Sequence, residues 1–582
     1  MRKILILFFV AIIFSSLSAQ EFGYPVEGEG WYSIKVRLPI EPKMEGGDWK
    51  IAEVQVNADR VRDYLLYRKG EEVFSKKLEG AGPYEIMVRY TWETEKVYEV
   101  RVYFMSKSGE KEICTAEPVK SPAKKGYWNS EWKNYLALRI AEENGEKRTH
   151  FPVHATVSVL SNYFSSSDEI RVVKTEKAGK DVSYAEIPCQ VYDVVKWADE
   201  KLLSAEEKDE QTGKLITRYN PTTTFSLTFQ VDLKPYEKAT FLVFYNNPKA
   251  KKPSYETDLS VSGEGLAKTI ENSFYKVVLQ EKSGMVHEVY EKSTGIKMEH
   301  KLETNGSIHW NPDVYSPPHA WSHCSDWENP SFTEVVGPVF YSLRRDATLP
   351  HVKDAQVSTT YYFYANTPYI LIESAMEIRK DLFVKALRNA EVVFNKEVFT
   401  EAAYKKMRGD VELIDFTNTK MHPEHVAILR PDTPWVCFFD QGKGVGFASL
   451  FLELTTGNIR GGQASTQQPY IYIQHGPWYY LSRAFVYSFG SNNQTRMLPV
   501  KEGSFYYEKN AWIPFAFKGK KGYARYLDTY YEMMKYPLKI EEVIETFAES
   551  PEGWLVPILT EPFEEGVEQA IGGKKKEEKG KK

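Results

Sequence analysis

The chain has 582 residues, of which 42% are hydrophobic, so it can fill several hydrophobic cores. Its 75 basic and 80 acidic side chains give a formal charge of −5. This balance lacks the basic excess of a protein that wraps nucleic acid, so no nucleic-acid partner is expected. Tyr, Phe and Trp together make up 14% of the chain, which suits β-rich folds and surfaces that stack on sugar rings.

The N-terminus has the pattern of a signal peptide. Arg2 and Lys3 precede an unbroken apolar run over residues 4–14, and small residues follow up to Ala19. The run is too short to span a bilayer, which takes about 20 apolar residues. We therefore expect residues 1–19 to be removed and the protein to be secreted or periplasmic, without a transmembrane anchor.

Alternating apolar and polar residues, the pattern of half-buried strands, dominate the chain from Trp31 onward. We predict a β-sandwich over residues 20–120, a second over 126–255 and a larger β-sandwich over 265–515. A helical or irregular segment is expected over 516–571, and a solvated charged tail over 572–582, for which adhesion to an anionic surface is the alternative. Helices are predicted at Tyr192–Leu203 and Gly522–Met534.

The four cysteines, Cys114, Cys189, Cys324 and Cys437, match no zinc-binding spacing. In an oxidising compartment they could form bridges, and buried free thiols are the other possibility. No cofactor is expected. A structural Ca²⁺ in an acidic loop stays open, as does Zn²⁺ at His319 and His323, which are four residues apart.

Residues 269–294, TIENSFYKVVLQEKSGMVHEVYEKST, form a credible hairpin with a turn at Ser283 and Gly284. This segment resembles the opening hairpin of the large sandwich domain in the galactose-mutarotase-like superfamily. The stretches EIRVVKTEKAGKDVSYAEIPCQVYD and FQVDLKPYEKATFLVFYNNP resemble the sandwich that precedes it, so the resemblance covers Asn134 to Tyr507. It implies an all-β fold in which N-terminal β-sandwich domains precede a large β-supersandwich, with a few short helices. Such domains occur in polysaccharide lyases and at the C-terminal side of some glycoside hydrolases.

Residues 305–329, NGSIHWNPDVYSPPHAWSHCSDWEN, form a predicted loop that is rich in Trp, His and acidic side chains. The tryptophans could stack on pyranose rings, and the histidines could transfer protons. Packing of the loop's own rings over the sandwich is the alternative interpretation. The candidates are Trp310, Trp321, Trp327, His309, His319, His323, Asp313, Asp326 and Glu328.

Two further segments carry candidate residues. The stretch 467–485 places His475, Trp478 and Tyr480 close together in sequence. In the stretch 338–356, alternation puts Tyr341 and Arg345 on one face of a strand and Arg344 on the other. The pair His422 and His425 flanks a predicted turn, which favours a structural role.

The leading functional hypothesis is a polysaccharide lyase that cleaves a uronic-acid-containing glycan by β-elimination. Its predicted catalytic residues are His319, His475, Arg345 and Tyr341. Its predicted substrate-binding residues are Trp310, Trp321, Trp327, Trp478, His323 and Tyr480. A glycoside hydrolase that uses Asp313, Asp326 or Glu328 is the first alternative, and a non-catalytic carbohydrate-binding protein is the second. In each case the expected partner is a polysaccharide or oligosaccharide.

Overall fold

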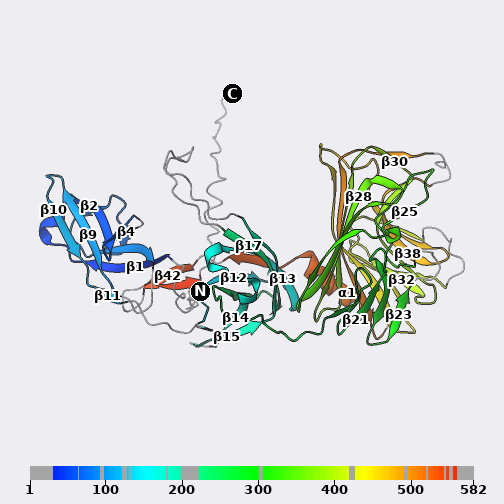
Figure 1. Cartoon of the computed structure of the whole chain (residues 1–582), viewed down its shortest axis with the longest axis horizontal. Coiled ribbons are helices and arrows are strands. Elements are labelled where there is room, and N and C mark those ends of the chain that lie inside the picture. Colours follow the sequence, from blue (N-terminus) through cyan, green and yellow to red (C-terminus); the bar gives the residue numbers. More distant parts are fainter. Residues whose placement is uncertain are drawn as a thin grey trace, which may run out of the picture.

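A computed structural model describes residues 31–62, 64–91, 97–120, 128–129, 131–132, 134–178, 181–197, 222–299, 306–417, 426–489, 496–519, 522–542, 545–549 and 555–559. The predicted signal peptide, the charged tail and the pair His422 and His425 lie outside these ranges. The described chain is almost entirely antiparallel strand, so the predicted all-β sandwich fold is confirmed. Three units follow one another along the long axis of the molecule (Figure 1).

The N-terminal unit pairs its strands in the orders β1-β7-β4-β5, β10-β9-β2-β3 with β6 on β2, and β11-β8. Its core is made of inward-facing residues such as Val54, Ile86 and Val102. The strands are β1 (Trp31–Leu38), β2 (Gly46–Val56), β3 (Asp59–Val61), β4 (Tyr64–Arg68), β5 (Glu71–Glu72), β6 (Lys77–Glu79), β7 (Tyr84–Thr91), β8 (Val97–Tyr98), β9 (Val100–Ser106), β10 (Lys111–Thr115) and β11 (Val119–Lys120).

The middle unit is a sandwich of two sheets, β15-β14-β18-β12-β41 and β13-β17-β16. Its last strand comes from the far C-terminal part of the chain, since β41 pairs with β12. The strands are β12 (Asn134–Ala141), β13 (Arg148–Leu160), β14 (Arg171–Ala178), β15 (Asp181–Ile187), β16 (Cys189–Lys196), β17 (Thr222–Leu233), β18 (Lys238–Tyr245) and β41 (Lys539–Glu542).

The large unit is built around two antiparallel sheets. The main sheet has the order β26-β27-β28-β29-β40-β36-β35-β32-β33, and the site sheet has the order β25-β24-β31-β38-β37-β34. The main-sheet strands are β26 (Ser331–Val336), β27 (Phe340–Leu349), β28 (Val352–Tyr364), β29 (Ile370–Ile378), β32 (Glu401–Lys405), β33 (Val411–Asp415), β35 (Trp435–Asp440), β36 (Val445–Asn458) and β40 (Ser504–Ala516). The site-sheet strands are β24 (Asp313–Tyr315), β25 (Ser322–His323), β31 (Ala386–Phe394), β34 (Ala427–Leu429), β37 (Tyr470–His475) and β38 (Tyr479–Tyr487).

A smaller sheet, β19-β20-β21-β22-β23, contains the predicted hairpin as β21 and β22, with Gly284 at φ +66° in the turn. The remaining strands pair as β30 with β39 and β42 with β43. These strands are β19 (Ser260–Ser262), β20 (Thr269–Glu271), β21 (Tyr275–Leu279), β22 (Val286–Glu291), β23 (Ile296–Glu299), β30 (Leu382–Val384), β39 (Leu498–Val500), β42 (Glu545–Glu549) and β43 (Leu555–Leu559).

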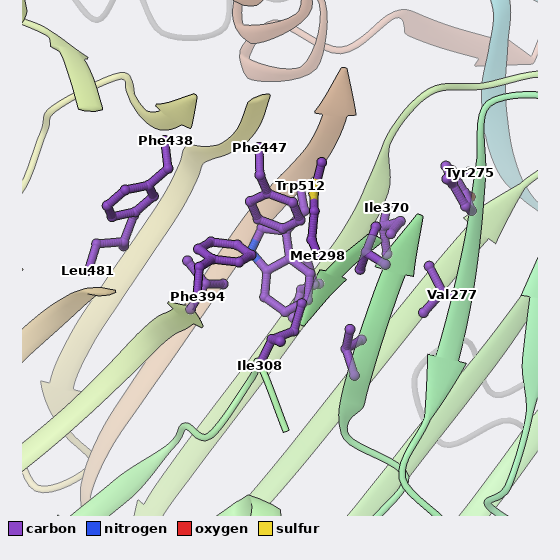
Figure 2. Close-up of a cluster of buried hydrophobic side chains, with 14 of the residues drawn as sticks. Tyr275, Val277, Met298, Ile308, Ile370, Phe394, Phe438, Phe447, Leu481 and Trp512 are labelled. Atoms are coloured by element: carbon purple, nitrogen blue, oxygen red, sulfur yellow. The ribbon is translucent and has the colours of Figure 1, made fainter. Parts of the chain in front are cut away.

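The core of the large unit lies between the main sheet and the site sheet (Figure 2). Phe394 and Leu481 come from the site sheet, and Phe447 and Trp512 come from the main sheet. Because strand residues alternate between faces, the neighbours of Phe394 and Leu481 point to the other face of the site sheet. That outer face carries the candidate site.

One helix prediction is confirmed and the other is wrong. The described α-helix α1 (Gly522–Lys535) buries Tyr523 and Leu527 against the large unit. The predicted helix at Tyr192–Leu203 begins instead inside strand β16, and its residues 198–203 lie outside the described ranges. A β-bulge between Tyr192 and Val195, with Asp193 at φ +50°, breaks the alternation that would have identified a strand.

All four cysteines are buried and free in the structure. Of the two possibilities given above, disulfide bridges and buried free thiols, the structure has the free thiols. In the described part of the chain, no helix is long and apolar enough to cross a membrane.

Candidate functional site

A buried group of charged side chains, here called the charge cluster, lies on the outer face of the site sheet. It consists of Asp313 on β24, His323 on β25, and Arg388 and Glu391 on β31. Asp313 is the register partner of both His323 and Arg388, so strand pairing alone brings the three side chains together. His323 keeps a side-chain exposure of 15%, whereas Asp313 and Glu391 are at 0% and Arg388 at 6%.

Arg388 holds the charge cluster together. Its Nε lies 3.0 Å from Oδ1 of Asp313, and its Nη2 also donates to this carboxylate. Its Nη1 lies 2.9 Å from Oε2 of Glu391 and donates to the Tyr472 hydroxyl at 2.7 Å. His323 Nδ1 lies 3.0 Å from Oδ2 of Asp313. One guanidinium therefore bridges two buried carboxylates.

A β-bulge in β31 places both charged residues of this strand on the same face. Arg388 and Glu391 are three positions apart, so a regular strand would direct them to opposite faces. The pairing of β31 with β38 shifts register between Asn389 and Val392, and Ala390 has φ +54°. Strained bulges of this kind concentrate near functional sites.

Aromatic rings surround the charge cluster and form what we call the aromatic layer. Trp310 contacts Trp478 and His323 edge-on, at centroid distances of 5.9 and 5.6 Å. Trp321 stacks on His323 at 5.9 Å, and the Arg388 guanidinium lies 4.2 Å from its ring centroid. The aromatic layer comprises Trp310, Trp321, Tyr472, Trp478 and Tyr480, of which Trp321 and Trp478 are half-buried and the others are buried.

The two carboxylates of the charge cluster have pKa values displaced in opposite directions. Burial raises the pKa of Glu391 to about 7, and the attraction of Arg388 opposes this only in part. Burial would also raise the pKa of Asp313, but Arg388 and His323 outweigh it and lower that pKa. Asp313 in turn raises the pKa of His323 against the effect of burial. Near neutral pH the cluster therefore combines an ionised carboxylate with a carboxyl group that can give up a proton.

This assignment predicts a pH-dependent stability difference between the wild type and Glu391→Gln. Because folding raises the pKa of Glu391, ionisation of its carboxyl between about pH 4.5 and about pH 7 destabilises the fold. Glutamine imitates the neutral acid, so the variant should gain stability relative to the wild type as pH rises through this window. Urea unfolding at several pH values measures the difference. Parallel pH profiles of the two proteins would contradict the assignment, and the exposed Glu377→Gln is the matched control.

The structure brings most of the predicted substrate-binding residues together and leaves one apart. Trp310, Trp321, Trp478, His323 and Tyr480 all belong to the site. Trp327 lies instead in a separate core, where its indole N–H donates to the Thr348 carbonyl at 2.9 Å.

The predicted catalytic residues do not meet at this site. His319 is exposed, and its ring lies 6.2 Å from that of His351. His475 is half-buried against Phe416, and burial lowers its pKa. As the register partner of Tyr479, His475 lies on the opposite face of the site sheet from Tyr480.

Arg345 and Tyr341 lie in the interior of the large unit. Their shared face and the exposure of Arg344 confirm the predicted alternation of β27. Arg345 is at 0% exposure and donates to the Thr359 hydroxyl at 2.6 Å, and the Tyr341 hydroxyl donates to Glu334. A substrate on the surface of this structure cannot reach Arg345.

The other acidic and histidine candidates of the Trp/His loop have separate roles. Asp326 and Glu328 are exposed, and Glu328 pairs with Lys282 at 3.0 Å. His309 is buried and bonds to the Tyr361 hydroxyl at 2.6 Å. Within the described ranges, no group of His, Cys, Asp and Glu side chains has the geometry to hold a metal ion.

Sequence reasoning missed Arg388, Glu391 and Tyr472. The signal was an Arg, an Asn and a Glu within the run ALRNAEVVF, whose other residues are apolar and every residue of which is buried. Charged side chains in such a strand need partners, and these partners come from β24 and β37, which are distant in sequence.

This chain has only limited similarity to known proteins. No protein-family model matches the chain, and no curated protein matches it. An α-mannosidase from Enterococcus faecalis V583 is 12% identical, with a TM-score of 0.43, over 72% of this chain and 48% of that chain. A protein of glycosyl hydrolase family 38 from Enterococcus faecalis is 12% identical, with a TM-score of 0.42, over 73% of this chain and 50% of that chain.

The structural neighbours also include galactose mutarotase-like proteins. One from Lactobacillus casei ATCC 334 is 9% identical, with a TM-score of 0.28, over 44% of this chain and 100% of that chain. The chain spans about half the length of the two Enterococcus proteins. At these identities and TM-scores, the similarity does not identify the function of this chain.

Proposed function

We propose that this protein binds a glycan on the outer face of the site sheet. The observation that carries the proposal is the aromatic layer: half-buried Trp478 lies beside a polar cluster whose charges are fixed by ion pairs, and half-buried Trp321 is held by its stacking on Tyr315 at 5.0 Å. Aromatic faces pack against the C–H faces of sugar rings, while fixed polar groups select hydroxyl orientation. The buried ion pairs fix the orientation of Trp321, since Arg388 lies directly over its ring.

The test is binding to a panel of soluble polysaccharides, with Trp478→Ala as the diagnostic variant. Loss of one stacking ring should weaken binding about tenfold, since a ring contact is worth about 0.5–1.5 kcal/mol beyond its buried area. The matched control is Trp197→Ala, because Trp197 is 68% exposed on the middle unit, away from the site. Equal binding by wild type and Trp478→Ala, or no binding to any glycan, would contradict the proposal.

Hydrolysis of a glycosidic bond is the second candidate function, and the charge cluster favours it. Glycoside hydrolysis uses one carboxyl group as the acid and one carboxylate as the base or nucleophile. Glu391 and Asp313 have the pKa displacements that this division requires. Oε1 of Glu391 is buried without a hydrogen-bond partner among the described residues. Both carboxylates are fully buried, as Arg345 is, so this candidate requires that the side chains around Asp313 and Glu391 move before a substrate can reach them.

Product analysis separates this candidate from elimination. A hydrolase releases reducing ends without ultraviolet absorbance, and Glu391→Gln should lower its kcat about 100-fold or more. A lyase creates an unsaturated product that absorbs in the ultraviolet. Elimination has less support here, because the one guanidinium of the cluster is already paired with two carboxylates and is poorly placed to neutralise a uronate. Unsaturated products from any uronate glycan would reverse this preference.

A further inference from the structure

A cavity of about 380 Å³ lies between the middle unit, the main sheet and the end of helix α1. Its volume falls in the range of about 300–1,000 Å³ that is typical of small-molecule sites. None of the residues of the charge cluster or the aromatic layer lines it, so it is separate from the candidate site. Its aromatic wall consists of Phe151, Tyr192, Tyr362, Tyr364 and Tyr369.

An ion pair forms the polar part of the cavity wall. Glu373 on β29 and Lys509 on β40 are register partners, and their charged groups lie 3.0 Å apart. Their side chains are 27% and 34% exposed, and the Tyr362 hydroxyl donates to Glu373 at 3.2 Å. The pair presents both a hydrogen-bond acceptor and a donor while carrying no net charge.

His154 adds a third polar group that is also neutral. Nε2 of its ring bonds to the Tyr364 hydroxyl at 2.8 Å, and Nδ1 bonds to the Thr228 hydroxyl at 2.8 Å. The ring keeps accessible surface where it lines the cavity, yet the surrounding protein buries it enough to lower its pKa to about 4. At neutral pH the charged groups of the wall therefore sum to zero.

One wall residue also has an unsatisfied hydrogen-bonding group. Tyr369 is 3% exposed, and its hydroxyl has no hydrogen-bond partner among the described residues. A buried hydroxyl without a partner costs about 1–3 kcal/mol. The hydroxyl oxygen has no accessible surface in this structure, so an occupant of the cavity supplies the missing partner only after the Tyr369 ring shifts.

We propose that this cavity is a second binding site, for a neutral sugar unit. Tyrosine rings would pack against the sugar ring, while Glu373 accepts from and Lys509 donates to its hydroxyl groups. A charged sugar is disfavoured, because the wall has no unpaired charge to neutralise it. Because the walls come from two units and helix α1, the bound sugar would also stabilise their docking.

The experiment uses the full chain and a panel of glucose, galactose, mannose, cellobiose and glucuronate, with saturation-transfer NMR and calorimetry. The diagnostic variants are Glu373→Gln, which breaks the ion pair, and Leu371→Trp, which fills the cavity. The matched control is Glu377→Gln, which lies on the same face of β29, is exposed and does not line the cavity. We expect at least one neutral sugar to bind, with a loss of tenfold or more in both cavity variants and none in Glu377→Gln.

Three results would overturn the proposal: no neutral sugar binds, binding survives Glu373→Gln and Leu371→Trp, or glucuronate binds as tightly as the neutral sugars. If Leu371→Trp lowers the melting temperature, its loss of binding is not informative. The test then depends on sugar binding by Glu373→Gln, since this substitution preserves the shape of the side chain. Comparison with Trp478→Ala distinguishes binding in the cavity from binding at the aromatic layer. A sugar that binds only at the aromatic layer loses affinity in that variant and keeps it in Glu373→Gln.

Discussion

Replacing Arg388 with methionine is expected to destabilise the large unit by about 3–5 kcal/mol. The substitution keeps the bulk of the side chain but leaves the Asp313 and Glu391 carboxylates buried without their shared cation. Removal of one partner from a buried ion pair costs this much because the remaining charge is neither solvated nor compensated. Urea unfolding, followed by the fluorescence of the tryptophans around the site, measures the change.

Arg344→Met is the matched control for this prediction. Arg344 also projects from a strand and pairs with an aspartate, Asp346, at 2.9 Å, but its side chain is 57% exposed. Exposed pairs contribute about 0–1 kcal/mol, so this variant should unfold close to the wild type. Equal stability losses in Arg388→Met and Arg344→Met would show that Arg388 does not hold the charge cluster together.

Replacing Arg148 with methionine is expected to cost about 3 kcal/mol and to loosen the end of helix α1. Arg148 and Glu142 are both at 0% side-chain exposure and pair at 2.9 Å. The guanidinium also donates to the carbonyl of Met533 and, at 2.8 Å, to that of Tyr536. These carbonyls lie at the C-terminal end of α1, where intrahelical partners run out. The variant therefore removes the cation beside a buried carboxylate, which keeps only its backbone N–H donors, and leaves the helix-end acceptors without their side-chain donor.

Hydrogen exchange read by mass spectrometry tests this prediction. Peptides that cover the second half of α1 should exchange faster in Arg148→Met, while those of the N-terminal unit should not change. Lys174→Met is the control, since Lys174 pairs with Glu176 at 3.0 Å near the surface of the same unit. Unaltered exchange in α1 would mean that Arg148 does not fasten the helix to the middle unit.

The secondary structure was predictable where one spacing of apolar residues continued through a whole strand or helix. In strand β27 the alternation of side chains placed Tyr341 and Arg345 on one face and Arg344 on the other, but it did not reveal that Tyr341 and Arg345 would be buried. Helix α1 followed from apolar residues spaced three and four apart. Strand β16 was not predictable, because the bulge at Asp193 exposes Val194 and Val195 in succession and imitates a helical pattern.

Only the part of the site that comes from one short segment of the chain was predictable from the sequence. The loop 305–329 supplied Trp310, Trp321 and His323, since Trp and His gather there within a short span. Arg388 and Glu391 join them through two features that no local pattern reveals. One is the pairing of β24 with a strand more than seventy residues away, as shown by the separation of 75 between Asp313 and Arg388. The other is the bulge at Ala390 that turns Glu391 to the outer face.

Oxidative footprinting with and without a bound glycan shows which rings the glycan covers. We expect a glycan selected from the panel to protect Trp321 and Trp478 from oxidation, since both are half-buried on the outer face of the site sheet. Trp197, which is 68% exposed on the middle unit, should oxidise at the same rate in both samples. Saturable binding that leaves Trp321 and Trp478 unprotected would place the glycan elsewhere on the molecule and rule out a binding site on the outer face of the site sheet.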